Sequence, residues 1–338
     1  MLRINRERGD QGLLPTSKQQ DVLDELDRKI VVALQANVRA SWNQIAKVVA
    51  SSESTVARRA NRLLDDGVLK LLVAPEPSPV NASGSVLLQI NCDSGAMRSV
   101  AQTLADRPAV RFAALVTGPF DVLVEHEVES QQQLALLLTH DLDDVPGIKQ
   151  ITTHSVTRNF KKANEWARHL VGDGVDELRI EPASRAQLPA MDRIDLALID
   201  LLRDDARRSS ADLATSLVTS DSMVRRRLDA LISSKTISLS TYIEPRLMGF
   251  GLEAFVWLDV EFDTMARVAE QLRQLPQVRY LAATAGSSNL VCEIILPDVS
   301  RLYDFQSTVL ANCEGLKSAT ISLELQTLKR SFIQISQL

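Results

Sequence analysis

Two clusters of arginine carry the clearest chemical signal in this sequence of 338 residues. Arg58 and Arg59 are adjacent, Arg62 follows one helical turn later, and three arginines run together at Arg225–Arg227. A guanidinium group is planar and donates paired hydrogen bonds, which suits both a phosphate and the edge of a guanine base. For an isolated pair of arginines, a solvated basic face is the alternative. The elements that carry these side chains decide between the two.

Arg58 and Arg59 lie in the last of three short predicted helices. Residues 23–36 have apolar side chains at helical spacing, and Ser41 and Ser52 are each placed to cap a following helix. Gly67 then ends the third helix. Three short helices with a tight turn before the third predict a helix-turn-helix, with the basic face of the third helix outward. The expected DNA contacts on this helix are Ser54, Thr55, Arg58, Arg59 and Arg62.

The predicted helix-turn-helix pattern occurs twice along the chain. A shift of 168 positions places Asp24 on Asp192, Arg39 on Arg207 and Gly118 on Gly286, in one register that extends to Gly147 and Gly315. This period is too long for a solenoid repeat and identifies a duplicated module. Because the arginines recur in both copies, DNA contact is favoured over a solvated face. The expected contacts of the second copy are Ser222, Arg225, Arg226 and Arg227.

A region of alternating strands and helices follows each helix-turn-helix. The strands and helices of the first copy are predicted, in chain order, at residues 86–90, 96–105, 112–117, 121–128, 131–142 and 151–156. The order βαββαβ is the ferredoxin-like split motif. Its helices cover one face of the sheet, so the other face needs cover from a second chain or from the other copy. The expected fold class is α+β: two copies of a helix-turn-helix (winged-helix-like) domain followed by a ferredoxin-like βαββαβ domain.

The repeat and the composition between its copies predict six segments. Residues 171–190 are polar and contain two glycines and two prolines, which is typical of a linker. The expected boundaries are a mobile arm at 1–22, helix-turn-helix domains at 23–75 and 191–243, βαββαβ domains at 76–170 and 244–338, and the linker at 171–190.

Composition excludes several classes of protein. The hydrophobic fraction of 45% is ordinary for a globular protein, and no run approaches the roughly 18 apolar residues that a membrane helix needs. The N-terminus lacks the apolar core of a signal peptide. Three cysteines without CxxC spacing predict neither a disulfide framework nor a zinc site. We therefore expect a reduced, cytoplasmic protein without membrane contact, whose net charge of −5 confines any nucleic-acid contact to local patches.

Catalytic residues, metals and cofactors are not expected. The sequence has no recognisable Ser/His/Asp or Cys/His set and no glycine-rich phosphate loop. We interpret His126 and His154 as packed or surface residues, and Trp42 and Trp257 as packing residues. The acidic run at 141–144 is interpreted as a solvated loop.

The predicted helix-turn-helix resembles the signature of the leucine-responsive/asparagine-operon regulators, the Lrp/AsnC family. The resemblance rests on LDELDRKIVVALQANVRASWNQIAKVVASSESTVARRANRLLDDGVLK, and on LVTGPFDVLVEHEV and VPGIKQITTHSVTRNFK further along. Ordinary members carry one such unit, whereas this chain fuses two. The resemblance implies a transcription regulator that binds double-stranded DNA, responds to a small effector such as an amino acid, and forms a homo-oligomer through its βαββαβ domains.

The resemblance also places the effector near the glycine turn between the two middle strands of the βαββαβ domain. The first copy has Pro119 where the family usually has an acid, and the second copy keeps only the glycine. A glycine lets backbone N–H groups approach a bound carboxylate, and a plain hairpin turn is the alternative. The effector-binding residues that the resemblance implies are Thr117, Gly118, Phe120, Asp121, Gly286, Ser287, Ser288 and Asn289.

Two other functions share this pattern. Tandem proteins similar to the family include sirohaem decarboxylases, which need His and Arg or Tyr groups around a tetrapyrrole. The second copy repeats none of the four histidines, and the basic run that those enzymes carry after the helix-turn-helix is absent, so an enzyme is not expected. A nucleoid-organising DNA-binding protein would also have this fold. The two recognition helices differ, with Thr55 in one and Met223 in the other, so we expect two different half-sites.

Overall fold

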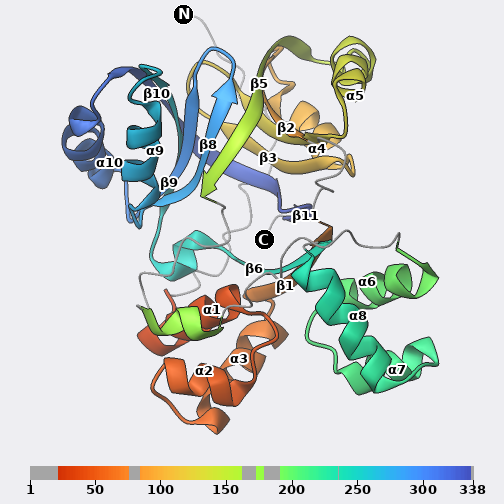
Figure 1. Ribbon diagram of the computed structural model, residues 1–338. Helices are drawn as coiled ribbons and strands as arrows, with labels where there is room; N and C mark the ends of the chain where they lie inside the picture. Colours follow the sequence, from red (N-terminus) through yellow and green to blue (C-terminus); the bar gives the residue numbers. More distant parts are fainter. Residues whose placement is uncertain (1–21, 76–83, 162–172, 179–190, 235, 336–338) are drawn as a thin grey trace, which may run out of the picture.

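The computed structural model describes residues 22–75, 84–161, 173–178, 191–234 and 236–335 (Figure 1). Most of the expected arm and linker, together with His169, lies outside the described residues. The two helix-turn-helix units lie side by side at one end of the molecule, and the two βαββαβ domains form one body at the other. Among the described helices, none is long and apolar enough to cross a membrane.

Local capping signals set the helices of the first unit as predicted. The Ser41 side chain accepts a hydrogen bond from the Gln44 amide in a capping box, and Ser52 accepts one from the Thr55 amide. Gly67 follows the third helix with φ of +68°, a conformation that glycine adopts without strain. The helices are α1 (Glu25–Ala36), α2 (Trp42–Val48) and α3 (Glu53–Asp65), and in the second unit α6 (Arg193–Asp204), α7 (Ser210–Leu217) and α8 (Asp221–Ser233).

A two-stranded antiparallel sheet joins the two units. Strand β1 (Leu69–Pro75) follows α3, and its counterpart β6 (Ile237–Ile243) follows α8. The strands pair along their whole length, with Leu72 opposite Ser240. Each unit therefore contributes the same element to one shared sheet, as two subunits of a symmetric dimer would.

The βαββαβ order is confirmed in both copies. The elements of the first copy are β2 (Gly84–Cys92), α4 (Met97–Ala105), β3 (Val110–Val116), β4 (Val122–Val128), α5 (Gln131–Leu136, continued by a π-helical turn at Leu137–Asp141) and β5 (Ile148–Lys161). The elements of the second copy are β7 (Leu252–Val260), α9 (Met265–Arg273), β8 (Val278–Ala285), β9 (Leu290–Leu296), α10 (Ser300–Asp304, continued by short turns to Asn312), β10 (Leu316–Arg330) and β11 (Ile333–Gln334).

The two four-stranded sheets close into one barrel. Strand β5 pairs with β8, and β10 pairs with both β3 and β7, so the last strand of each copy bridges to the other copy. Aromatic side chains from both sheets fill the interior, among them Phe112 and Phe120 from one copy and Phe255 and Trp257 from the other. The second copy, within the same chain, thus covers the sheet face that the sequence left open.

The first helix-turn-helix packs on parts of the chain that the sequence did not assign to it. A 3-10 helix at Asp173–Leu178, within the expected linker, places Val175 and Leu178 in the core of the unit, and Asn37 Nδ2 donates to the Leu178 carbonyl at 3.0 Å. This correction has a simple cause: two apolar residues in a polar segment are too few to show a period. A second 3-10 helix, Pro245–Met248, adds Leu247 from the other copy to the same core.

Candidate nucleic-acid interface

Arg59 and Arg227 occupy equivalent positions and do not face outward as predicted. Arg59 Nη1 bonds to Asp27 at 2.9 Å and to Asp24 at 2.5 Å. Arg227 makes the same two contacts with the first helix of its own unit, to Asp192 and Asp195, both at 2.8 Å.

These ion pairs correct the expectation that Arg59 and Arg227 face outward to contact DNA. The guanidinium of Arg59 lowers the pKa of the Asp24 carboxyl. The partners lie more than 30 residues apart along the chain, beyond the reach of a helical-face argument. The repeat did contain the signal, because both aspartates of each set recur at the same spacing as their arginine.

The remaining arginines of the two recognition helices are more open. Arg62 bonds to Asp27 at 2.5 Å, but half of its side chain is exposed. Arg225 pairs with Asp221 at 2.8 Å, one turn earlier on α8, and is 68% exposed. Arg58 and Arg226, which are equivalent in the repeat, are exposed and have no ion-pair partner in the described part of the chain.

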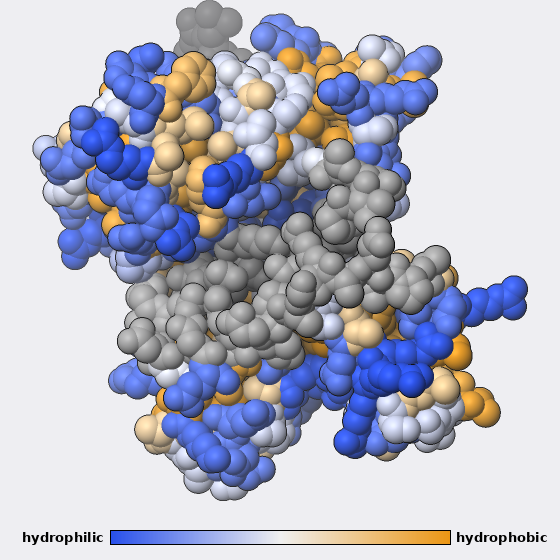
Figure 2. Space-filling model, in the orientation of Figure 1, coloured by the Kyte–Doolittle hydropathy of each residue, from blue (hydrophilic) through white to orange (hydrophobic). Residues whose placement is uncertain are grey.

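Hydroxyl groups gather at the start of both recognition helices. Ser54 and Ser222 are exposed at equivalent positions, each 3.2 Å from the hydroxyl of the capping serine. Thr55 accepts a hydrogen bond from the Ser52 hydroxyl at 2.8 Å and so belongs to the cap itself. Free amides and the helix dipole at such an end favour a phosphate. Figure 2 shows strongly hydrophilic side chains over the second helix-turn-helix, where α8 lies.

A reciprocal pair of arginines holds the two units together. Arg39 donates to the carbonyl of Ala206 at 2.7 Å and of Arg208 at 3.1 Å. Arg207 donates in return to the carbonyls of Val38 and Ala40, the second at 2.9 Å. The shift of 168 positions maps each of these contacts onto the other. Arg39 and Arg207 therefore form a two-fold clamp between the loops that precede α2 and α7.

Sequence reasoning missed this clamp, although the repeat aligned its two arginines. The Arg207 guanidinium also lies 3.8 Å from the centre of the Trp42 ring, so Trp42 is the packing residue that was expected. Burial lowers the pKa of Arg207 to about 10, which leaves it charged at neutral pH. A single sequence gives no sign that an arginine spans two domains, because both acceptors are backbone carbonyls.

The two glycine turns of the barrel pack against the opposite copy. Thr117 N donates to the Leu323 carbonyl at 2.8 Å, and Leu323 N donates to Thr117 Oγ1 at 3.0 Å. Gly118 has φ of +109°, and a Cβ atom on it would lie 3.2 Å from Ser322 Oγ. A Cβ atom on Gly286 would lie 2.5 Å from Nδ1 of His154, which is the repeat equivalent of Ser322. The backbone conformation thus requires glycine at position 118, and close packing requires it at position 286.

Most of the other turn residues already have structural contacts. Asp121 accepts a hydrogen bond from the Cys92 amide at 2.8 Å, and Asn289 accepts the equivalent bond from Val260 at 3.0 Å. Phe120 is 2% exposed and meets the Trp257 ring edge to face. Ser287 is exposed, and the carbonyl of Ser288 accepts a hydrogen bond from Thr284 at 2.7 Å.

A cluster of buried charges lies on the second copy. Arg330 contacts three carboxylates, those of Glu253 at 3.0 Å, Glu293 at 2.8 Å and Glu324 at 2.7 Å. Arg279 also pairs with Glu293, and the two guanidiniums outweigh burial and lower the pKa of Glu293 to about 2. Burial raises the pKa of Glu324 to about 7. The three carboxylates lie close enough to hold a metal ion, but each of them is paired with a guanidinium of Arg279 or Arg330.

Two family models match the chain, each of them twice. The AsnC-type helix-turn-helix domain matches residues 23–64 and 191–232. The Lrp/AsnC ligand binding domain matches residues 85–166 and 253–333.

Relatives that carry a single unit match the length of one copy. An uncharacterized HTH-type transcriptional regulator of Pyrococcus furiosus is 30% identical over 142 residues, which is 42% of this chain and 95% of the relative. The HTH-type transcriptional regulator FL11 of Pyrococcus horikoshii is 28% identical, over 42% of this chain and 95% of its own. The HTH-type transcriptional regulator Ptr1 of Methanocaldococcus jannaschii is 27% identical, over 41% and 95%.

The whole tandem arrangement has a counterpart among solved structures. The siroheme decarboxylase NirDL covers 93% of this chain and 95% of its own, with a TM-score of 0.61 and 15% sequence identity. At this identity the likeness establishes a shared fold and nothing about chemistry. Together, the helix-turn-helix units, the closed βαββαβ pair and the family models that match both copies make this chain a member of the Lrp/AsnC family, in tandem form.

Proposed function

We propose that the chain is a transcription regulator that binds double-stranded DNA with both of its recognition helices, α3 and α8. The observation that carries this proposal is the clamp of Arg39 and Arg207, which holds two helix-turn-helix units in a reciprocal arrangement within one chain. Paired recognition helices must match the spacing of successive grooves, and a pair fixed within one chain presents a single spacing to the DNA. The single-unit relatives, which are named as HTH-type transcriptional regulators, support the same function.

The side chains proposed for DNA contact are those that are open at the start and on the outer face of each recognition helix. Arg58 and Arg226 come first, because both are exposed at equivalent positions. Arg59, Arg227 and Thr55 position these helices through contacts within their own units. The full set proposed for direct contact is Ser54, Arg58, Arg62, Ser222, Arg225 and Arg226.

The ligand-binding domains are proposed to respond to a small metabolite such as an amino acid at the glycine turns. The support is that the backbone at Gly118 and the side chain of Ser287 are exposed there. Saturation of binding by an amino acid, and its loss in Ser287→Trp with the fold intact, would test the assignment. We also propose that complete chains assemble further into homo-oligomers, which light scattering tests directly.

We propose that the chain is not an enzyme. The buried carboxylates of the second copy are committed to Arg279 and Arg330, and His126 and His154 are both buried side chains. An absorption spectrum of the purified protein tests the alternative, because a bound tetrapyrrole would give a Soret band. Decarboxylation of added sirohaem would overturn the proposal.

The deciding experiment on DNA binding is selection of fragments from a random pool at two salt concentrations. We expect a defined motif that persists at the higher salt. Arg58→Ala combined with Arg226→Ala should reduce the slope of log affinity against log salt by about 0.9 for each phosphate that the variant no longer neutralises. Arg203→Ala, an exposed arginine on α6 that pairs with Asp200, is the matched control and should leave the slope unchanged. Retention of arbitrary sequences that vanishes with salt would instead favour a nucleoid-organising role, and an unchanged slope in the double variant would refute these contacts.

A further inference from the structure

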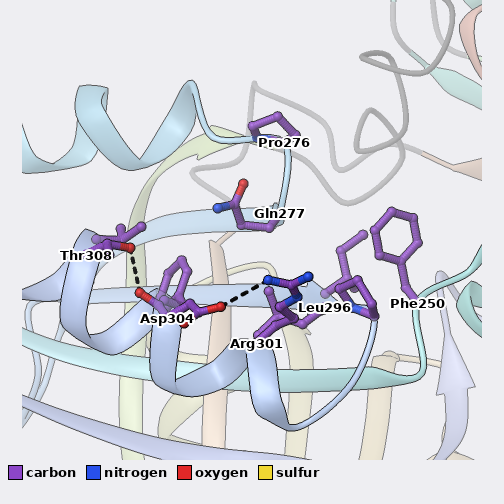
Figure 3. A pocket seen from close by; sticks show the side chains of 11 residues that line it. Phe250, Pro276, Gln277, Leu296, Arg301, Asp304 and Thr308 are labelled. Atoms are coloured by element: carbon purple, nitrogen blue, oxygen red, sulfur yellow. Dashed lines mark hydrogen bonds and ion pairs between the residues drawn. The ribbon is translucent and has the colours of Figure 1, made fainter.

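A small pocket opens on the second βαββαβ domain, at the ends of β8 and β9 that lie opposite the glycine turn at Gly286. It lies between α10 with its continuation and the adjoining ends of β8 and β9 (Figure 3). Its volume is about 340 Å³, at the lower end of the range of small-molecule sites. Most of its lining is apolar: Phe250, Pro276, Ile295, Leu296, Phe305 and Val309.

One side of the pocket carries an opposite pair of charges. Arg301 Nη1 lies 3.2 Å from Asp304 Oδ2, and both side chains are more than half exposed. Such an exposed pair is weak, so a ligand can exchange with it. A ligand carboxylate would bind the guanidinium of Arg301, whose geometry allows two parallel hydrogen bonds. A ligand ammonium would bind the carboxylate of Asp304. Thr308 and Gln277 add polar groups beside them (Figure 3).

The back wall of the pocket is also part of the first helix-turn-helix core. Ile295 is fully buried in that core, and Phe250 packs against it. Phe250 follows the segment Pro245–Gly249, whose Leu247 carbonyl accepts a hydrogen bond from Leu23 N at 2.8 Å, just before α1. The same segment continues from β6, the strand that joins the two units. Phe250 and Ile295 therefore connect the pocket to the core that contains the buried residues of α1.

We propose that this pocket binds a free amino acid with an apolar side chain, and that its occupation alters how the first helix-turn-helix sits on the second βαββαβ domain. The apolar floor selects the side chain, and the Arg301–Asp304 pair selects a molecule that carries both charges. The site is separate from the glycine turns. Only its effect on DNA rests on the proposed function, because binding and the response of α1 are properties of the protein alone.

Calorimetry on the full chain tests the ligand class. We expect L-phenylalanine to bind, and 3-phenylpropionate and phenethylamine, which each carry one of the two charges, to bind at least tenfold more weakly. Arg301→Gln and Asp304→Asn should each weaken L-phenylalanine binding at least tenfold. The matched control is Arg267→Gln on α9, which breaks a similarly exposed ion pair with Glu314. No binding of L-phenylalanine, equal binding of the three probes, or unchanged binding in both pocket variants would overturn the proposal.

Hydrogen exchange tests the coupling without any DNA. L-phenylalanine should change the exchange of residues 23–36 and 245–251, and this change should disappear in Arg301→Gln. Exchange that changes only around α10 would overturn the coupling. DNA affinity measured with and without L-phenylalanine tests the proposed function separately. A chain that binds no DNA would refute the proposed function, whereas the calorimetry and hydrogen-exchange results test the pocket independently of DNA.

Discussion

Arg207→Ala is the sharpest test of the fixed pair of DNA-binding units. The substitution removes two hydrogen bonds from a charged donor to the carbonyls of Val38 and Ala40, and the contact with the Trp42 ring. Arg39 and its two acceptors remain, so half of the clamp is left intact.

The expected loss follows from these contacts. A hydrogen bond to a charged group contributes about 1.5–3 kcal/mol, and a cation–π contact about 0.5–2 kcal/mol. Because contacts of one side chain are not additive, we expect the variant to lose about 2–4 kcal/mol of the free energy that holds the two units together. Each unit keeps its own core, so the loss falls on the interface rather than on either unit.

The assay is DNA affinity against the spacing of two selected half-sites, with hydrogen exchange of residues 37–40 and 205–208 in parallel. The wild type should prefer one spacing, and Arg207→Ala should accept spacings longer or shorter by a few base pairs and exchange faster at both loops. Arg208→Ala is the control, because its side chain bonds to Ser216 within its own unit at 2.6 Å. A variant that keeps both the spacing preference and the slow exchange would refute the clamp.

Three further substitutions, the last of them with a control, probe the packing described above. Gly286→Ala should lower the free energy of unfolding by about 1–3 kcal/mol in urea titrations, because the new Cβ atom meets the His154 ring at 2.5 Å. Burial lowers the pKa of His154, so the folded protein favours the neutral imidazole. This contribution to stability is fully present above the ordinary pKa of 6.5 and is lost as the pH falls from 6.5 through the lowered pKa of the folded state. Stability should therefore fall by up to about 1.4 kcal/mol per pH unit in acid, and less steeply in His154→Ser, the residue found at the equivalent position. Arg59→Ala should lower the stability of the first unit by about 1 kcal/mol, whereas Arg58→Ala should leave the melting temperature unchanged.

Local signals in the sequence predicted the elements well. Ser41, Ser52 and Gly67 each act on backbone groups within a few residues, so their roles could be read without knowing the fold. The βαββαβ order followed in the same way from runs of apolar residues. Closure of the barrel by β5 and β10 could not be predicted, because two copies can pair within a chain or between chains by the same contacts.

The candidate site was less predictable than the fold for a physical reason. Which way an arginine turns depends on charges brought close by folding, and Asp27 draws both Arg59 and Arg62 toward α1. The clamp of Arg39 and Arg207 uses only backbone acceptors, which every segment of a chain offers. Comparison of the two copies does not separate the two kinds of arginine, because the open pair Arg58 and Arg226 recurs just as the bonded pair Arg59 and Arg227 does.

Because two copies are fused in one chain, equivalent positions can hold different residues. Such differences occur both in the barrel and in the helix-turn-helix units. At the turns, Ser322 faces Gly118 where His154 faces Gly286. At the recognition helices, Arg225 stands where the first copy has Ala57. Because unlike side chains contact unlike bases, the best site should consist of two different half-sites, and a mismatched base pair in either typically costs about 1–3 kcal/mol. Affinities for the selected site and for the two perfect palindromes built from its halves measure this directly. Tightest binding to one of those palindromes would show that the two helices read the same sequence and that the clamp joins functionally equivalent units.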